Sequence, residues 1–246
     1  MRTPLTTRPR RVALALAACA LLATGATACE PPLPPPVFTV DPDAAGADAA
    51  PGNGVCATAG DLCSLQAAVE EANALATRTT IEMTGGTVPD LELTVTGTID
   101  VVAGDEAAQA LFWTTWIVAE GAQLTVTDAL LGRVEVDGTF LARRVIIGGA
   151  AAGPGEVEPI VEVGATGAAL VSNAHVIATN APFVTNAGVL SVHGVTVSPQ
   201  ADGADPIITT EAGGQTRLSA TAVLGGPDGT DVCAGEAPTS YGYNLV

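Results

Sequence analysis

The sequence predicts an all-β fold, a right-handed parallel β-helix solenoid with a short N-terminal capping helix. Three observations favour this fold. From residue 80 onward, short runs alternate apolar and variable residues, which is the periodicity of strands. These runs recur as a degenerate repeat, and residues 64–75 just before them show the spacing of a single amphipathic helix.

The repeat is clearest in four segments, at 124–131, 140–147, 169–176 and 190–197. Each reads apolar, variable, apolar, variable, turn, apolar, variable, apolar, and their starts are 16, 29 and 21 residues apart. Strand-forming repeats of this size predict a solenoid, in which each coil contacts its neighbours. A β-sandwich is the main alternative. It needs hairpin turns at most junctions, and the region offers Asp-Gly pairs only at 137–138, 202–203 and 228–229.

Aligning the segments predicts which side chains point into the coils. Four inward rows start, in the first segment, at Leu124, Val126, Ala129 and Leu131. A single residue separates the two alternating halves of each segment and forms a corner. We expect this corner to be irregular, because its residues do not form the asparagine stack of many β-helices: Asp128, Arg144, Asn173 and Gly194.

Some outward positions are also apolar, and these define a candidate partner surface. They are predicted to share one wall of the stack: Leu130, Leu141, Ile146 and Leu170. Monomers rarely leave a large contiguous apolar patch exposed, so something is expected to cover this wall. The alternatives are a partner molecule, a second copy, or the chain's own insert at 148–159.

The N-terminus resembles a signal peptide over residues 1–28. Four arginines precede an apolar run at 12–23 that is too short to span a bilayer. Small residues then lead to Cys29, as in a bacterial lipoprotein signal, so we expect lipidation of Cys29. The alternatives are ordinary secretion with cleavage near Ala28, and a lipoprotein site at Cys19. The proline-rich stretch 29–36 is predicted to form an extended tether.

The charge of the chain changes at the same point. After residue 28 there are five arginines, no lysine and all 26 acidic residues, which gives a formal charge of −21. Such a surface repels nucleic acid and anionic lipid, because both need cations to neutralise phosphate. The composition therefore excludes nucleic acid as a partner, and it leaves a lipid anchor as the expected membrane contact.

Two close cysteines precede the predicted helix. Cys56 and Cys63 would close a small loop and suit a disulfide in an oxidising compartment, while Cys233 is left without a partner. Ser64 is predicted to N-cap the helix. Glu70 and Glu71 are expected on its solvated face, opposite an apolar face made of Leu65, Ala68, Val69, Ala72 and Leu75.

The stretch from Cys56 to Asn73 resembles the CSLREA-type N-terminal segment that precedes right-handed parallel β-helices in bacterial surface proteins. The chain departs from that motif at Gln66 and Ala67, which stand at its arginine and acidic positions. The resemblance implies a helix that plugs the open end of the first coil. It suggests an N-terminal cap at 37–79 with the disulfide loop and helix, followed by β-helix coils at 80–246.

Candidate binding residues are few. Trp113 and Trp116 could stack on a sugar ring, although buried packing is the more common role of such residues. Asp41, Asp43 and Asp48 could ligate calcium, but they lack the spacing of an EF-hand, and a solvated loop is the simpler interpretation. No other cofactor is indicated, and no catalytic motif appears in the coils.

These observations favour an exported, lipid-anchored cell-surface protein with a non-catalytic binding, adhesion or structural role. Its expected partner is a cell-surface glycan or a protein. Two alternatives remain open. One is a carbohydrate-active enzyme on the same fold, either a polysaccharide lyase or a hydrolase, and the other is a passive structural spacer.

Overall fold

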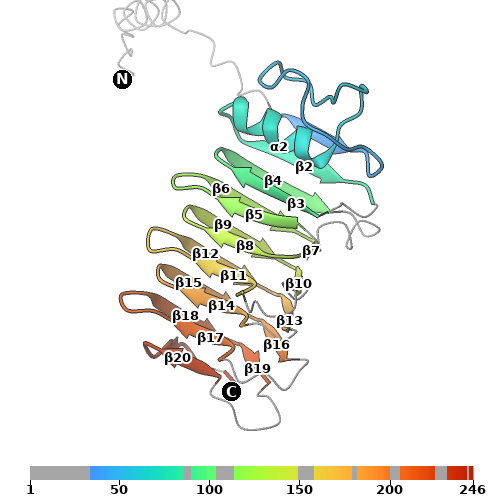
Figure 1. The fold of residues 1–246 in the computed structure, drawn as a ribbon. Coiled ribbons are helices and arrows are strands. Elements are labelled where there is room, and N and C mark those ends of the chain that lie inside the picture. The colour runs from blue at the N-terminus through green and yellow to red at the C-terminus, as the bar shows by residue number, and fades with distance from the viewer. Residues whose placement is uncertain are drawn as a thin grey trace, which may run out of the picture. The chain divides into compact units, whose positions relative to one another are not determined.

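The computed structural model describes residues 34–85, 90–103, 114–148, 158–178, 182–199, 206–224, 232–242 and 244–245. Internal contacts divide the chain between Pro34 and Pro35, and the description below concerns the unit from residue 35 onward. This unit is a parallel β-helix. Its strands form three all-parallel sheets, and one helix precedes the coils (Figure 1). The predicted fold class is therefore confirmed.

Each sheet collects one strand from successive coils. Sheet A has nine strands, in the order β1 (Val37–Val40), β2 (Thr79–Met83), β4 (Thr98–Ala103), β6 (Gln123–Thr127), β9 (Thr139–Arg143), β12 (Ala168–Ser172), β15 (Val189–His193), β18 (Gln215–Ser219) and β21 (Thr239–Ser240). Sheet B has seven, in the order β3 (Leu91–Val95), β5 (Thr114–Val118), β8 (Val134–Val136), β11 (Val161–Val163), β14 (Val184–Asn186), β17 (Ile208–Thr210) and β20 (Cys233–Gly235). Sheet C has five, in the order β7 (Leu130–Leu131), β10 (Ile146–Gly148), β13 (His175–Ala178), β16 (Thr196–Pro199) and β19 (Ala222–Val223).

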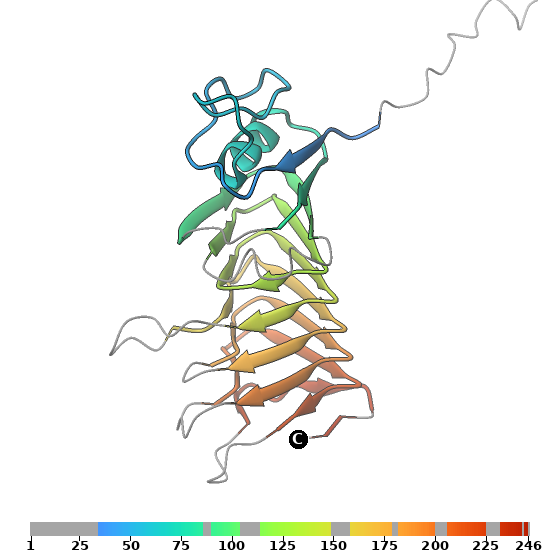
Figure 2. The same cartoon turned by 90° about the vertical axis from the view of Figure 1, so that its right-hand side faces the viewer.

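A complete coil runs from sheet B through sheet A to sheet C, as in β8, β9 and β10, and the next coil repeats the path (Figure 2). The strand register matches the predicted rows. Leu124 pairs with Phe140, Phe140 with Ala169, and Ala169 with Leu190. In sheet C, Leu131, Ile147, Val176 and Val197 pair in succession.

The inward rows form one continuous hydrophobic core. Leu124, Phe140 and Leu190 have no exposed surface, and Ala169 is 4% exposed. The strands alternate as the period of two requires: β6, β9 and β12 each bury their second and fourth residues. Small and branched side chains fill most of the interior, together with the fully buried aromatic rings of Trp116, Phe140 and Phe183.

The corner between sheets A and C has a regular backbone, which corrects the expectation of an irregular corner. Its residues all have a positive φ, between 48° and 62°: Asp128, Arg144, Asn173, Gly194 and Ala220. This left-handed conformation turns the chain within one residue. The side chains differ, but the same backbone turn repeats at these five positions.

The capping helix α2 spans Leu65–Ala74 and lies at the N-terminal end of the coils (Figure 1). The hydroxyl of Ser64 accepts the backbone N–H of Ala67 at 3.0 Å, so the predicted N-cap is confirmed. Leu65, Ala68, Val69 and Ala72 are buried in the core shared with the coils. The helix thus covers apolar surface that the first coil would otherwise expose.

Asn73 fastens the end of α2 to the first coil. Its amide nitrogen donates to the carbonyl of Thr94 at 2.7 Å, and its oxygen accepts the backbone N–H groups of Thr96 and Gly97 at 2.8 Å and 3.2 Å. These backbone groups lie at the turn between β3 and β4. One side chain therefore satisfies three backbone groups at the edge of the solenoid.

Candidate functional site

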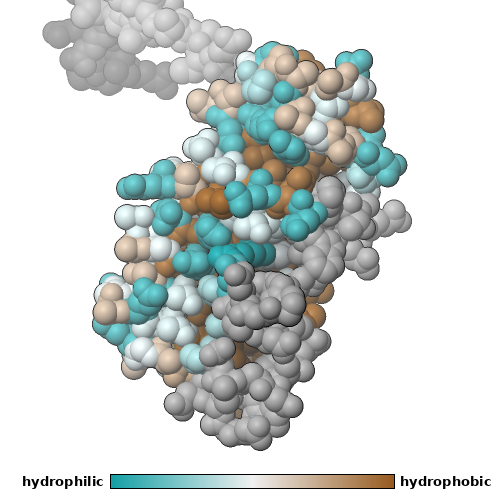
Figure 3. Space-filling view, viewed as in Figure 1, coloured by the Kyte–Doolittle hydropathy of each residue, from teal (hydrophilic) through white to brown (hydrophobic). Residues whose placement is uncertain are grey.

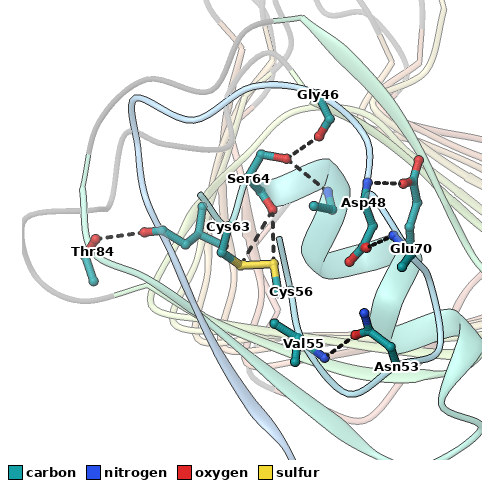
Figure 4. Close-up of a disulfide and its surroundings, with 12 residues drawn as sticks. Gly46, Asp48, Asn53, Val55, Cys56, Cys63, Ser64, Glu70 and Thr84 are labelled. Atoms are coloured by element: carbon teal, nitrogen blue, oxygen red, sulfur yellow. Dashed lines mark hydrogen bonds between the residues drawn. A yellow bond between two sulfur atoms is a disulfide. The ribbon is translucent and has the colours of Figure 1, made fainter. Parts of the chain in front are cut away.

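The loop before α2 is closed by a disulfide, as the cysteine spacing predicted. Cys56 and Cys63 are bonded, and their Cα atoms lie 5.1 Å apart (Figure 4). The Ser64 hydroxyl also donates to the carbonyl of Gly46 at 2.5 Å, which holds the start of the loop against the helix. The loop, the disulfide and the helix N-terminus therefore form one tied cap.

The two adjacent glutamates of α2 hold the rest of this loop, which corrects the prediction that both face solvent. Glu71 is fully buried, and its two carboxylate oxygens accept the backbone N–H groups of Gly52 and Gly54. Both glycines have a positive φ, of 91° and 84°. Backbone N–H groups in such a turn form a nest that binds an anion, and here the anion is the chain's own carboxylate.

Glu70 makes the neighbouring contacts of the cap. Its carboxylate accepts the backbone N–H of Asp48 at 2.7 Å (Figure 4). It also accepts the side-chain amide of Gln66 at 2.9 Å. The pair is therefore structural. Its two carboxylates anchor two points of one loop, and they do not face each other as an acid–base pair would.

The candidate calcium ligands fold into local turns. Asp41 accepts the backbone N–H of Asp43 at 3.0 Å, and the buried Asp48 accepts that of Ala50 at 2.7 Å. Within the residues that the structure describes, no group of three or more His, Cys, Asp or Glu side chains is placed to hold a metal ion. A small, mainly apolar pocket lies close by, between Val40, Gly46, Leu65 and Leu91.

The predicted partner surface falls on two sheets. Leu130 pairs with Ile146 in sheet C, and Leu141 pairs with Leu170 in sheet A. The left-handed corner at Arg144 separates β9, which holds Leu141, from β10, which holds Ile146. The four residues therefore form two pairs on adjacent sheets. Ile146 is 43% exposed, and the other three are partly exposed. The insert expected to cover them lies, at 149–157, outside the described residues.

Sheet A has an outer face that differs in charge from the chain as a whole. Its outward side chains from β6 onward are polar, apolar or basic, and none of them is acidic: Gln123, Thr125, Thr127, Thr139, Leu141, Arg143, Ala168, Leu170, Ser172, Val189, Ser191, His193, Gln215, Arg217, Ser219 and Thr239. A face with no carboxylate is unusual in a chain with 26 acidic residues. We call it the A face.

Sheet B has an acidic outer face. Glu135 and Glu162 are direct neighbours there, and Arg133 bridges them at 3.1 Å and 3.3 Å while also pairing with Glu158. The arginine offsets the repulsion between the two stacked glutamates. In the view of Figure 3, hydrophobic atoms reach the surface between hydrophilic ones over the coils next to the helix.

Of the remaining residues singled out from the sequence, Trp116 and Cys233 lie within the described part of the chain. Trp116 is fully buried in β5, between Leu93 and Val134, so its indole is not available to stack on a sugar. Trp113 and Cys29 lie outside the described residues. Cys233 is unbonded and stacks on Ile208 at the last described coil, where burial raises the pKa of its thiol.

Two exposed side chains on the A face were not singled out from the sequence. The Nδ1 atom of His193 lies 2.8 Å from the hydroxyl of Ser219 in the next coil. The guanidinium of Arg217 contacts the amide oxygen of Gln215 at 3.3 Å. His193 already lies at a variable position of the predicted segment 190–197, and extending the repeat register by one coil would have placed Arg217 on the same outer side.

No protein-family model, curated protein or solved structure matches this chain. The resemblance to CSLREA-type segments therefore stays a prediction. Among the described residues, no helix has both the length and the apolar character needed to cross a membrane.

Proposed function

We propose that this protein is exported, held at the cell surface through Cys29, and acts there by non-catalytic binding or adhesion. The disulfide in the cap supports export, because such bonds persist in oxidising compartments. The cap closes the coil end that would otherwise offer an unpaired, apolar edge to other chains. A rigid stack of this kind suits display of a fixed surface.

The observation that carries the binding role is the A face. It combines hydroxyl groups, amides, two arginines and the paired Leu141 and Leu170 on one parallel sheet. Polar groups around a small apolar centre are the usual composition of a binding surface. The ligand expected there is a surface glycan or a protein.

The test compares two matched double variants. Leu141→Ser with Leu170→Ser alters the A face, and Leu130→Ser with Ile146→Ser alters sheet C to a similar degree. We expect the first variant to lose binding to glycan arrays or to intact cells, while its melting temperature stays near that of the second. If both variants bind as the unaltered chain does, the A face is not the binding surface.

The same preparation separates the other functions. Release of oligosaccharides from polysaccharides by the unaltered chain would replace the binding role with the enzymatic alternative. If the protein is displayed on cells but binds neither glycans nor other cells, the role of a passive structural spacer remains. Anchoring is tested by mass measurement of the exported chain and of a Cys29→Ser variant, which should lose the acyl mass and leave the membrane fraction.

A further inference from the structure

The A face continues toward the N-terminus onto β2 and β4, and the middle outward row of this extended face is nearly symmetric along the stack. One outward residue from each of eight strands, β2 to β21, makes up this row: Thr80, Asp100, Thr125, Leu141, Leu170, Ser191, Arg217 and Thr239. From the centre outward, a leucine matches a leucine, a hydroxyl matches a hydroxyl, an acid matches a base and a threonine matches a threonine. We propose that two copies of this chain pair face to face through their A faces.

This arrangement follows from the geometry of an isologous interface, in which residue i of one copy meets residue j of the other and the reverse. A two-fold axis along the strands, between β9 and β12, keeps each row opposite itself and inverts the order of coils. Leu141 then faces Leu170 of the second copy, Thr125 faces Ser191, and Asp100 faces Arg217. The proposal rests on the proposed function in taking the A face as the binding surface, and it names a second copy of the chain as the protein bound there.

Charge favours a second copy on this face. After residue 28 the chain carries a formal charge of −21, so most surfaces of two copies would repel each other. Outward residues of sheet A from β2 to β21 carry two carboxylates, Glu82 and Asp100, and two arginines, Arg143 and Arg217. Two such faces can meet without a net repulsion between their own charges.

Asp100 already has a partner within the chain. Arg78 contacts its carboxylate at 2.5 Å and 3.0 Å, and the acid is only 15% exposed. In the pair, Arg217 of the second copy would add a second guanidinium to the same carboxylate. In the flanking row Arg143 faces Ser172 and His193 faces Thr127, so no charged side chain directly faces one of like charge.

The size of the face also fits a dimer. The eight strands from β2 to β21, each about 4.8 Å wide, cover about 38 Å, and five residues of a strand span about 16 Å. The flat footprint is about 600 Å² per copy. Stable interfaces bury about 800 Å² of accessible surface per partner, which exceeds their flat footprint because side chains interdigitate.

The experiment uses the full chain with Cys29→Ser, so that lipid does not drive association. Sedimentation velocity should show a concentration-dependent dimer. Leu141→Glu and Leu170→Arg should each weaken it by about tenfold or more, because a charge then meets an apolar leucine. Leu130→Glu, on sheet C, should leave it unchanged.

Mixing the two variants gives the sharpest result. In the mixed dimer the introduced glutamate faces the introduced arginine, and the other leucine pair stays intact, so we expect association to return. A second measurement places Thr125→Cys in one copy and Ser191→Cys in the other, both with Cys233→Ser, and expects an intermolecular disulfide only in the mixture. An unaltered chain that stays monomeric, or folded variants that show neither effect when mixed, would overturn the dimer. Ligand binding by the A face would still stand in that case.

Discussion

The buried carboxylate of Glu71 accepts the backbone N–H of Gly54, so the helix that caps the coils also folds the loop in front of it. The same carboxylate accepts the N–H of Gly52. The loop, the helix and the first coil are thus coupled, because α2 packs on the coil interior with one side and binds the loop with another. Loss of this contact should loosen the cap as a unit.

Replacing Glu71 tests this coupling. Glu71→Gln keeps the shape but places an amide N–H₂ against a backbone N–H, so we expect a loss of about 2–3 kcal/mol in the free energy of unfolding. Glu70→Gln is the matched control and should cost less, because Glu70 is partly exposed. Urea unfolding measures both, and equal losses would show that Glu71 has no special role.

The disulfide is expected to stabilise the cap further. The sequence separation of Cys56 and Cys63 is seven residues, and closing so short a loop contributes about 2–3 kcal/mol on the chain-entropy model. Cys56→Ala with Cys63→Ala should lower the unfolding midpoint accordingly, and reductant should have the same effect on the unaltered chain. Alkylation without reductant that labels both thiols of the exported protein would refute the bond.

Ala220 occupies a corner position that suits glycine better. Its φ is 48°, a conformation that costs a residue with a Cβ about 1–2 kcal/mol. Ala220→Gly should therefore raise the melting temperature slightly, whereas Ala222→Gly, in the adjacent strand β19, should lower it.

At Gly194, with φ of 62°, a Cβ would lie 2.9 Å from the Asn173 side-chain oxygen, so Gly194→Ala should destabilise the coil. Stabilisation by this last change would contradict the assigned corner.

The corner ion pair predicts a pH dependence. Arg144 hydrogen-bonds Asp128 at 2.6 Å and 2.7 Å, and this contact lowers the pKa of Asp128 below its usual 3.8. A carboxyl group with a depressed pKa in the folded state stabilises the fold above its unfolded pKa. That contribution disappears as the pH falls through the folded value. Asp128→Asn should thus be slightly less stable than the unaltered chain near neutral pH, and this difference should shrink as the pH falls through the folded pKa of Asp128. Both groups are exposed, so the effect is small, and a difference that persists in acid melts would have another cause.

The sequence predicted the coil interior well because the period-two alternation and the core share one cause. In the segments that begin at Leu124 and Phe140, each apolar position of the repeat is buried, and the observed register pairs those two residues. Ser64 was also predictable, since an N-cap depends on a local hydrogen bond.

Other features depend on contacts that the local pattern does not contain. Glu71 looked solvated because its partners, Gly52 and Gly54, lie well before it in the chain and bind through backbone atoms alone. The run Gly52-Asn53-Gly54 was the one sequence feature that indicated a turn with free backbone N–H groups. Trp116 lies in β5, before the segments that define the repeat, so its inward position could not be read from their alignment.

The sequence did not predict that the four apolar outward residues divide between sheets A and C. Leu141 and Ile146 look equivalent in the repeat, but the turn at Arg144 sends them to different sheets. A positive φ at the corner is a property of the backbone, and the differing corner side chains concealed it.

The register of β10 supports the assignment of every face, and one comparison of two neighbouring residues tests it. Val145 is 2% exposed and Ile146 is 43% exposed. Val145→Asp should lower the free energy of unfolding by about 3 kcal/mol or more, because it buries a carboxylate without a partner. Ile146→Asp should change it little. Urea unfolding of the two variants measures the difference directly: a large loss for Val145→Asp alone is the result expected here, and equal losses, or a larger loss for Ile146→Asp, would contradict the coil register and the faces derived from it.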